Sequence, residues 1–344
     1  MVLCPLLAVM LMVSCYSNER DSYAEFANTP KGNFTALWTI MDRHYCFFDH
    51  KEQELGVNWD EVFERYSSYI SDGMSSRSLF EVLCQMLAEL RDGHVNLYSS
   101  YDVGRSWHMH TDYPSNFSKD LQDEYLGDDY VIVGSECYYR IFTDNIGYFV
   151  VGSFADGFSD NRLNVMISNM FMCNGLIIDL RDNGGGNSLY AERLASRFTE
   201  EGVLTGYTCY KTGPGHNDFS ELTENWLEPD RYNYRWIKPV VLLVNRGCFS
   251  SANEFVCMMK GLPGVTVVGD TTGGGGGMPF LSELPNGWSV RFSSAPSFDA
   301  SKNHIEEGIA PDIHLDMDDP DLKAGVDTYI EFARKFISDK IVNP

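Results

Sequence analysis

The stretch from 239 to 256, PVVLLVNRGCFSSANEFV, contains adjacent serines at a point where one of them could act as a nucleophile. An apolar run typical of a buried strand ends at Asn245, and a helix is expected to begin near Ser251. A hydroxyl at such a turn lies beside helix N–H groups and the positive end of the helix dipole. This setting suits an attacking Ser251, because the N–H of Ala252 can stabilise an oxyanion. The alternative is that Ser250 or Ser251 only caps the helix.

A second candidate is the stretch 175–187, GLIIDLRDNGGGN, in which an apolar run meets three glycines. A glycine turn leaves backbone N–H groups unobstructed, which fits a cradle for an anion or an oxyanion. The pattern matches neither GxxxxGK[ST] nor GxGxxG, so it does not favour a nucleotide phosphate. The alternative interpretation is a tight strand-to-helix turn without a ligand.

His94 and a pair of acidic residues complete the set of side chains that could do chemistry. His94 ends a strongly patterned helical stretch, and Gly93 frees the backbone before it. Imidazole is the natural general base near neutral pH. Glu306 and Glu307 lie in HIEEGIAPDIHL, which reads as a turn. The alternatives are a structural histidine and two solvated carboxylates.

The composition excludes several classes of function. The chain has 344 residues and a formal net charge of -23, which repels phosphate backbones, so no nucleic-acid partner is expected. The nine cysteines are scattered and form no CxxC pair, so neither a zinc site nor a redox motif is supported. We therefore expect no metal and no organic cofactor.

The N-terminus predicts an exported protein. Residues 1–15, MVLCPLLAVMLMVSC, are apolar but too short to span a bilayer, as in the core of a signal peptide. The last four of them resemble a bacterial lipobox, in which Cys15 becomes the acylated N-terminus. The segment lacks the usual Lys or Arg before the apolar run, and a plain secretory signal or a frayed terminus is the alternative. We expect a polar tether over 16–30 and a lipid anchor in the cell envelope, periplasmic or on the outer surface.

The remaining chain falls into two parts with different sequence patterns. Residues 31–98 carry apolar side chains at helical spacing, for example Leu79, Leu83, Met86 and Leu90, behind a capping-box pattern that begins at Ser78. Residues 99–344 alternate continuous apolar strands with helices and end in a C-terminal helix. This alternation predicts an α/β domain whose core sheet is covered by helices on both faces, preceded by a small helical bundle.

The order of the motifs resembles one known family. LxDGH at 90–94, DLRxNGGG at 179–186, VNxxxxSSANE at 244–254, GxxTxGG at 269–275 and EGIAPD at 307–312 follow one another. The C-terminal processing proteases and the core of the tricorn protease share this order, and the resemblance covers roughly residues 34–335. It implies a crotonase-like fold and serine peptidase activity on peptide or protein substrates. The helical N-terminal part and the lipoprotein signal are similar to members common in Bacteroidetes.

The resemblance implies roles for individual residues. Ser251, three residues before Glu254, matches the family's nucleophile, and the N–H of Ala252 is one oxyanion donor. The second donor is expected from the NGGG turn. Relatives carry proline, which has no N–H, at the position of Gly184, so Gly185 is the better candidate.

The resemblance also selects the general base. One branch of the family uses a lysine on the downstream strand, but that position falls at about Gly276 and no lysine occurs between Lys260 and Lys302. The tricorn-like branch uses a histidine, which His94 matches. Gly93 stands where that branch has a second serine. Glu306 is expected to support His94, with Glu307 close behind.

Three further points follow from the same resemblance. The stretch between His94 and the strand IGYFVV has no room for a PDZ-sized insert, which puts C-terminal-specific processing in doubt. A non-catalytic binder of an apolar ligand or peptide, like the retinoid-binding repeats of the eye, is the main alternative to a serine endopeptidase. A crotonase-like enzyme for acyl thioesters is another, but it has no use for a nucleophilic serine.

Overall fold

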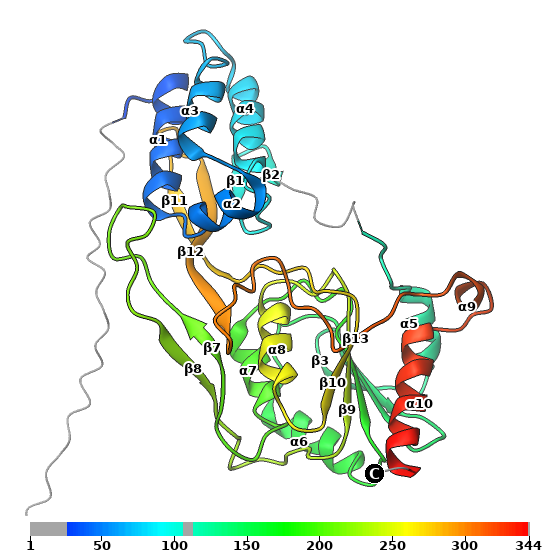
Figure 1. Ribbon diagram of the computed structural model, residues 1–344. Coiled ribbons are helices and arrows are strands. Elements are labelled where there is room, and N and C mark those ends of the chain that lie inside the picture. Colours follow the sequence, from blue (N-terminus) through cyan, green and yellow to red (C-terminus); the bar gives the residue numbers. More distant parts are fainter. Residues whose placement is uncertain (1–25, 106–112, 343–344) are drawn as a thin grey trace, which may run out of the picture.

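The computed structural model of the chain describes residues 26–105 and 113–342. The predicted signal segment 1–15 with Cys15, and most of the predicted tether, lie outside the described residues. Helix α1 begins at Pro30, which is the last residue of the predicted tether. The described chain forms a helical piece beside a larger sheet domain (Figure 1). None of its helices has both the length and the apolar character needed to cross a bilayer.

The helices of the described chain are α1 (Pro30–His44), α2 (Phe48–Leu55), α3 (Trp59–Ser67), α4 (Ser76–Ala88), α5 (Lys119–Leu126), α6 (Asp160–Asn169), α7 (Ser188–Ala195), α8 (Ser251–Lys260), α9 (Asp319–Lys323) and α10 (Thr328–Val342). The strands are β1 (Asn96–Tyr98), β2 (Val103–Arg105), β3 (Val131–Gly134), β4 (Cys137–Ile141), β5 (Gly147–Val151), β6 (Leu176–Asp179), β7 (Val203–Thr208), β8 (Thr223–Leu227), β9 (Val240–Val244), β10 (Val265–Gly269), β11 (Gly277–Glu283), β12 (Ser289–Asp299) and β13 (Ile313–His314).

A seven-stranded sheet forms the core of the larger domain, in the order β13-β10-β9-β6-β5-β4-β3. The strands from β13 to β5 run parallel, and β4 and β3 extend the sheet as antiparallel strands. Parallel strands place their carboxyl ends at one edge of the sheet, so the turns after β6 and β9 come close together there. This edge carries the residues that the sequence analysis singled out.

Both faces of the sheet are buried, because successive side chains of a strand point to opposite sides. Ile178 and Leu242 pack on the side of α6, α7 and α8, whereas Ile177 and Val241 pack under α10. Strand β9, VVLLV, is buried along its whole length. The predicted α/β architecture with helices on both faces is thus confirmed.

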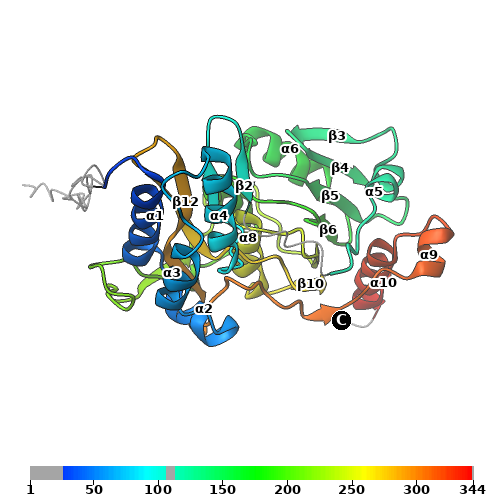
Figure 2. The same cartoon turned by 90° about the horizontal axis from the view of Figure 1, so that it is seen from above.

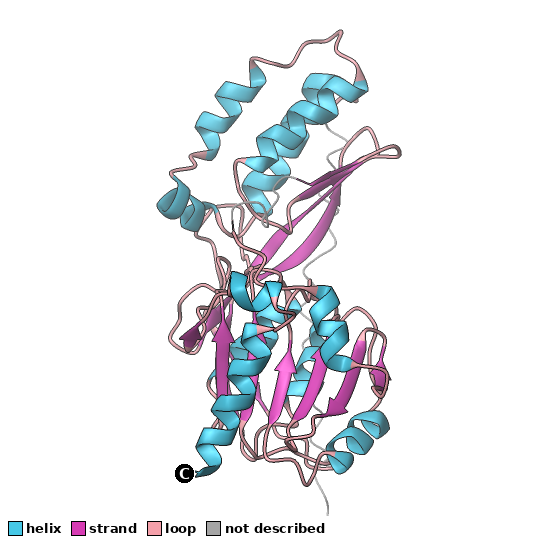
Figure 3. Ribbon diagram, turned by 90° about the vertical axis from the view of Figure 1, so that its right-hand side faces the viewer, coloured by secondary structure: helices cyan, strands magenta, loops and turns pink. Residues whose placement is uncertain are grey.

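The helical piece is joined to the core by one long strand. Residues 289–291 of β12 pair with β1, which follows α4, whereas residues 297–299 of the same strand pair with β7 of the larger domain. Val290 and Phe292 are buried among the side chains of α1–α4. Figures 1 and 3 show β12 running from the helical piece toward the sheet domain, and Figure 2 shows α1–α4 at one end of the molecule and β3–β6 at the other. The helical piece therefore includes a segment that lies about 200 residues further along the chain than its helices, outside the predicted range of 31–98.

Helix α4 begins earlier than the predicted capping box. Its N-cap is Ser75, whose hydroxyl accepts the N–H of Ser78, and Ser76 is the first helical residue. Ser78 is therefore inside the first turn. The reason is that Ser75 offers the same capping oxygen one turn earlier, which adds helical hydrogen bonds to the same apolar stripe.

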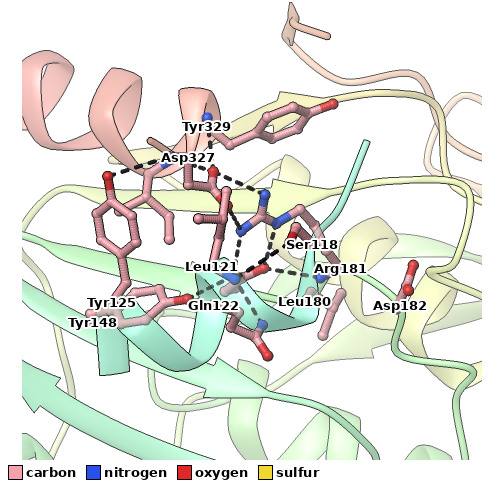
Figure 4. Close-up of polar contacts among 12 residues, drawn as sticks. Ser118, Leu121, Gln122, Tyr125, Tyr148, Leu180, Arg181, Asp182, Asp327 and Tyr329 are labelled. Carbon is pink, nitrogen blue, oxygen red and sulfur yellow. Dashed lines mark hydrogen bonds and ion pairs between the residues drawn. The ribbon is translucent and has the colours of Figure 1, made fainter. Parts of the chain in front are cut away.

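A buried cluster of charges fixes the end of β6 (Figure 4). The guanidinium of Arg181 donates to both oxygens of Asp179, at 2.8 and 2.7 Å, and to both oxygens of Asp327, at 3.1 and 3.0 Å. Tyr148 and Gln122 donate to Asp179 as well. Arg181 and the two carboxylates are fully buried, so each charge depends on the others for its stabilisation. The cluster ties the turn that follows β6 to the start of α10.

We expect Asp327→Asn to destabilise the fold by about 3 kcal/mol, because it leaves the charge of Arg181 without one of its two buried partners. Urea unfolding measures this free energy through the midpoint and slope. Glu81→Gln is the control, since Glu81 forms an exposed ion pair with Arg77 and its loss should cost less than about 1 kcal/mol. Equal stabilities of the two variants would contradict the role given to the cluster.

Candidate active site

Ser250 occupies a sharp turn between β9 and α8. Its backbone has φ 57° and ψ −122°, a region that side chains other than glycine rarely adopt. The turn is held by two hydrogen bonds: the N–H of Ser250 donates to the carbonyl of Gly274 at 2.9 Å, and the N–H of Phe249 donates to the carbonyl of Asn183 at 3.0 Å. The hydroxyl of Ser250 caps no helix N–H, so it remains available for another partner.

That partner is His94. Its Nε2 lies 3.0 Å from Oγ of Ser250, although the two residues are 156 positions apart in the chain. The ring of His94 also packs against the ring of Phe249, with 4.8 Å between the centroids. The structure therefore forms a serine–histidine pair at the predicted turn, with Ser250 in place of the predicted Ser251.

Ser251 points into the protein. It is 1% exposed, and its Oγ has no hydrogen-bond partner among the described residues. Successive residues at the start of a helix are rotated by about 100°, so Ser250 and Ser251 cannot face the same histidine. The prediction of Ser251 as the hydroxyl beside His94 is wrong by one residue for this reason.

The turn that carries His94 is fixed by a buried carboxylate. One oxygen of Asp92 accepts the backbone N–H of His94 at 2.7 Å, and the other accepts the hydroxyl of Ser293, a residue of β12, at 3.0 Å. Burial lowers the pKa of His94 to about 4, although the charge of Asp92 acts in the opposite direction and Arg291 lowers the pKa further. The imidazole is thus neutral, and able to accept a proton, at any pH well above 4.

The glycine turn after β6 lies directly against Ser250. Gly185 has φ 97°, and a Cβ at this position would sit 2.9 Å from Cβ of Ser250 and 3.0 Å from the backbone nitrogen of Ser251. The nearest atom would be the carbonyl oxygen of Phe249, at 2.6 Å. Only glycine therefore lets the turn after β6 pack so closely against the Ser250 turn.

The two predicted oxyanion donors are both used inside the protein. The N–H of Gly185 donates to the side chain of Asn183 at 2.8 Å, and the N–H of Ala252 donates to the carbonyl of Phe249 at 3.1 Å. These predictions are therefore wrong for the structure as it stands. The N–H of Ser251, the first helical residue, has no acceptor within its own helix, and its nitrogen lies close to Gly185.

Glu306 and Glu307 do not contact His94. One oxygen of Glu306 accepts the N–H of Gly276 at 2.9 Å, and the other lies 3.4 Å from Nζ of Lys51. Glu307 pairs with Lys51, at 2.9 Å, and with His50. Nδ1 of His94 has no partner among the described residues. The predicted direct support of His94 by Glu306 is not formed, because the helical piece supplies a lysine that holds this carboxylate.

The glycine run at 273–277 forms a wall of the site. Gly274 has φ 79°, and a Cβ there would lie 1.8 Å from the carbonyl oxygen of Glu306. A Cβ on Gly275 would lie 2.4 Å from the ring of Phe249. Glycine is thus required for the backbone to pass between Glu306 and the Ser250 turn. No side chain of this run can serve as a base, and Lys51 is already engaged by Glu306 and Glu307.

The described residues contain no group of three or more His, Cys, Asp or Glu side chains placed to hold a metal ion. The chemistry available to the site is that of a hydroxyl, an imidazole and backbone N–H groups. Asp92 and Lys51 were not singled out by the sequence. Asp92 lies in the LxDGH motif two residues before His94, which is the spacing of a side chain that caps its own turn, so this signal was present.

The chain is similar to known peptidases in its sequence and in its fold. Residues 145–315 match peptidase family S41, and residues 26–88 match the C1 domain of the tricorn protease. The crystal structure of a candidate peptidase from Parabacteroides merdae ATCC 43184 is 49% identical, with a TM-score of 0.85 over 90% of this chain and 97% of that chain. Mature CPAF, solved in complex with lactacystin, has the same fold at 13% identity, with a TM-score of 0.72 over 92% of this chain and 99% of that chain.

Among curated relatives, the carboxy-terminal processing protease CtpA of Bacillus subtilis (strain 168) is 27% identical over 184 residues. The match covers 53% of this chain but only 37% of that relative, so the chain spans little more than a third of its length. The crotonase-like fold expected from the sequence is confirmed by the solved structures of this group. The chain belongs to peptidase family S41, a family of serine peptidases.

Proposed function

We propose that this protein hydrolyses peptide bonds through an acyl-enzyme formed on Ser250, with His94 as the general base. The observation that carries the proposal is the 3.0 Å contact between Nε2 of His94 and Oγ of Ser250, at a turn with a strained backbone. A hydroxyl that packs no core and caps no helix, next to a neutral buried imidazole, has the arrangement that activates a serine nucleophile.

The first half of the reaction forms an ester. Nε2 of His94 takes the proton of the Ser250 hydroxyl while Oγ bonds to the peptide carbonyl carbon. The negative charge that develops on the carbonyl oxygen faces the N–H of Ser251 at the positive end of α8. The protonated His94 then gives its proton to the leaving amine, and the C–N bond breaks.

The second half of the reaction restores the enzyme. His94 takes a proton from a water molecule, whose oxygen attacks the ester carbon, and the proton then returns to Oγ of Ser250 as the acid product leaves. The carboxylate of Asp92 raises the pKa of His94, so it stabilises the imidazolium present in both halves. Asp92 acts on the base through this charge and through the backbone N–H that it holds.

We also propose that the protein is exported and anchored to a membrane through Cys15. The support is the apolar segment that ends in Met-Val-Ser-Cys, which precedes the described residues. Its substrates would then be peptides or proteins of the cell envelope. The expected lipid anchor can be tested by mass spectrometry of the protein isolated from membranes.

The first experiment tests whether Ser250 or Ser251 is the nucleophile, and whether the protein is a peptidase or a non-catalytic binder. A fluorophosphonate probe should label the wild type and Ser251→Ala, but not Ser250→Ala, because only the Ser250 hydroxyl contacts His94. Fluorescence in a gel and mapping of the labelled peptide give the readout. Labelling that is lost in Ser251→Ala and kept in Ser250→Ala would restore the original assignment. A wild type that is never labelled would favour the binder of an apolar ligand or peptide.

A second experiment disturbs the close approach of the glycine turn to Ser250. We expect Gly185→Ala to slow labelling by about 100-fold or more, because its Cβ would clash with the carbonyl of Phe249 and displace the Ser250 turn, and because its φ of 97° disfavours alanine. Gly261→Ala is the matched control: Gly261 follows the last residue of α8, and its added Cβ would meet no residue outside its own helix within 4 Å. Thermal unfolding of both variants checks that the fold is kept. Equal labelling rates of the two variants would show that the reaction does not depend on this close packing.

The acid limit of the reaction reports the pKa of His94. A general base must be neutral, and burial lowers the pKa of His94 to about 4, so the rate of labelling should fall only as the pH drops toward 4. Asp92→Asn removes the charge that raises this pKa while it keeps the oxygen that accepts the N–H of His94. The midpoint should therefore move to still lower pH in this variant. A midpoint at or above the ordinary value of 6.5 would refute the assigned environment.

A further inference from the structure

A cavity of about 250 Å³ opens beside the Ser250–His94 pair. Phe249, which precedes Ser250, and Gly93, which precedes His94, both line it. A group bound in this cavity would thus contact the chain neighbour of each member of the pair. The chemistry of its wall determines which substrate residue it accepts.

The wall is basic in a protein that is strongly acidic overall. Lys51, Arg91 and Arg246 all line the cavity, whereas the chain as a whole has a formal net charge of -23. Charges more than about 8 Å away are screened at physiological ionic strength, so a bound group is affected mainly by this local wall. The local charges, and not the net charge, therefore decide the preference of the cavity.

Acidic residues of the wall do not cancel all three cations. Glu306 and Glu307 also line the cavity, but Lys51 forms ion pairs with both, and His50 binds Glu307 as well. These two carboxylates are thus held by side chains of α2. Neither Arg91 nor Arg246 pairs with them, and the ion pair of Arg246 is with Asp270, which does not line the cavity.

Arg246 is held in place without having its donors satisfied. Its guanidinium stacks on the ring of Tyr113, with 3.9 Å to the centroid. Nε lies 3.7 Å from a carboxylate oxygen of Asp270, which is beyond a hydrogen bond, and this buried nitrogen has no hydrogen-bond partner among the described residues. The one hydrogen bond of its guanidinium, to the carbonyl of Thr272, is long at 3.5 Å.

Arg91 stands at the rim of the same cavity. Its backbone has φ 45°, in the left-handed region, within the turn that leads to His94. The side chain is exposed, and it forms no ion pair with the residues that the structure describes. A ligand placed between Arg91 and Arg246 would meet two guanidinium groups.

We propose that this cavity is a substrate subsite that binds a carboxylate of the peptide next to the scissile bond, with Arg246 as its main ligand and Arg91 at its rim. A guanidinium matches a carboxylate through two parallel N–H···O bonds, and stacking on Tyr113 presents it in one orientation. The carboxylate belongs to an acidic side chain or to the C-terminus of the substrate. The inference rests on the proposed peptidase function and adds a substrate class to it.

The test compares peptides that differ by one charge. A panel of synthetic peptides with Asp or Glu at each position is cleaved by the wild type, and mass spectrometry locates the cut. The preferred peptide is then compared with its Asn or Gln analogue and with its C-terminal amide. A preference lost with Asn or Gln identifies a side-chain carboxylate, and a preference lost with the amide identifies the C-terminus.

Variants connect the preference to Arg246. We expect Arg246→Met to lower kcat/KM for the carboxylate peptide by about 10-fold to 100-fold and to leave kcat/KM for its neutral analogue nearly unchanged. Arg246→Lys should restore part of the preference, since lysine keeps the positive charge but lacks the paired N–H donors of the guanidinium. Arg231→Met is the control, because Arg231 is exposed and does not line the cavity. A structural role of Arg246 would lower both rates equally.

Two outcomes separate this inference from the peptidase function. If the probe labels Ser250 but the wild type cleaves charged and neutral peptides equally, or cleaves none of the panel, the carboxylate subsite is wrong while the reactive serine stands. If the probe labels neither serine, the peptidase function itself is wrong.

Discussion

The site depends on one contact between two parts of the chain that fold around different cores. Nε2 of His94 lies at the end of the helical piece, and Oγ of Ser250 lies on the edge of the seven-stranded sheet, with 3.0 Å between them. Such a contact tolerates displacements of only a few tenths of an ångström before the hydrogen bond is lost. The helical piece must therefore be fixed on the sheet domain, and β12 does this by pairing with β1 at one end and with β7 at the other. Ser293 of the same strand bonds to Asp92, which holds the backbone of His94.

The backbone at Ser250 stores strain that its surroundings offset. A non-glycine residue with φ 57° and ψ −122° costs of order 1–3 kcal/mol. The turns on either side supply hydrogen bonds to Phe249 and Ser250, and both turns need glycine to come so close. The buried charge cluster around Arg181 holds the first of these turns, and the bond from Gly276 to Glu306 holds the second. The strain is thus located at Ser250, whereas the stabilising interactions are made by other residues around it.

The sequence predicted the architecture and pointed to His94, but it did not predict which side chains contact each other in the site. Apolar strands between helices were sufficient for the sheet and the helical piece, because these depend on local periodicity, whereas the order of the motifs pointed to His94. Ser250 and Ser251 have the same side chain, and only the direction that the backbone gives to each distinguishes them. The N–H groups of Gly185 and Ala252 were expected to be available, but each finds an acceptor two or three residues earlier in its own turn. Glu306 was expected beside His94, but Lys51 comes from a helix whose position no local pattern encodes.

The path of the chain through the site has a consequence during translation. Synthesis delivers His94 first, then the NGGG turn, then Ser250, and the glycine run and Glu306 after that, while Asp327 follows near the end. A nascent chain that stops before β12 has an imidazole and a hydroxyl but no strand to bring them together. The Ser250–His94 pair can therefore form only when nearly the whole polypeptide has been made.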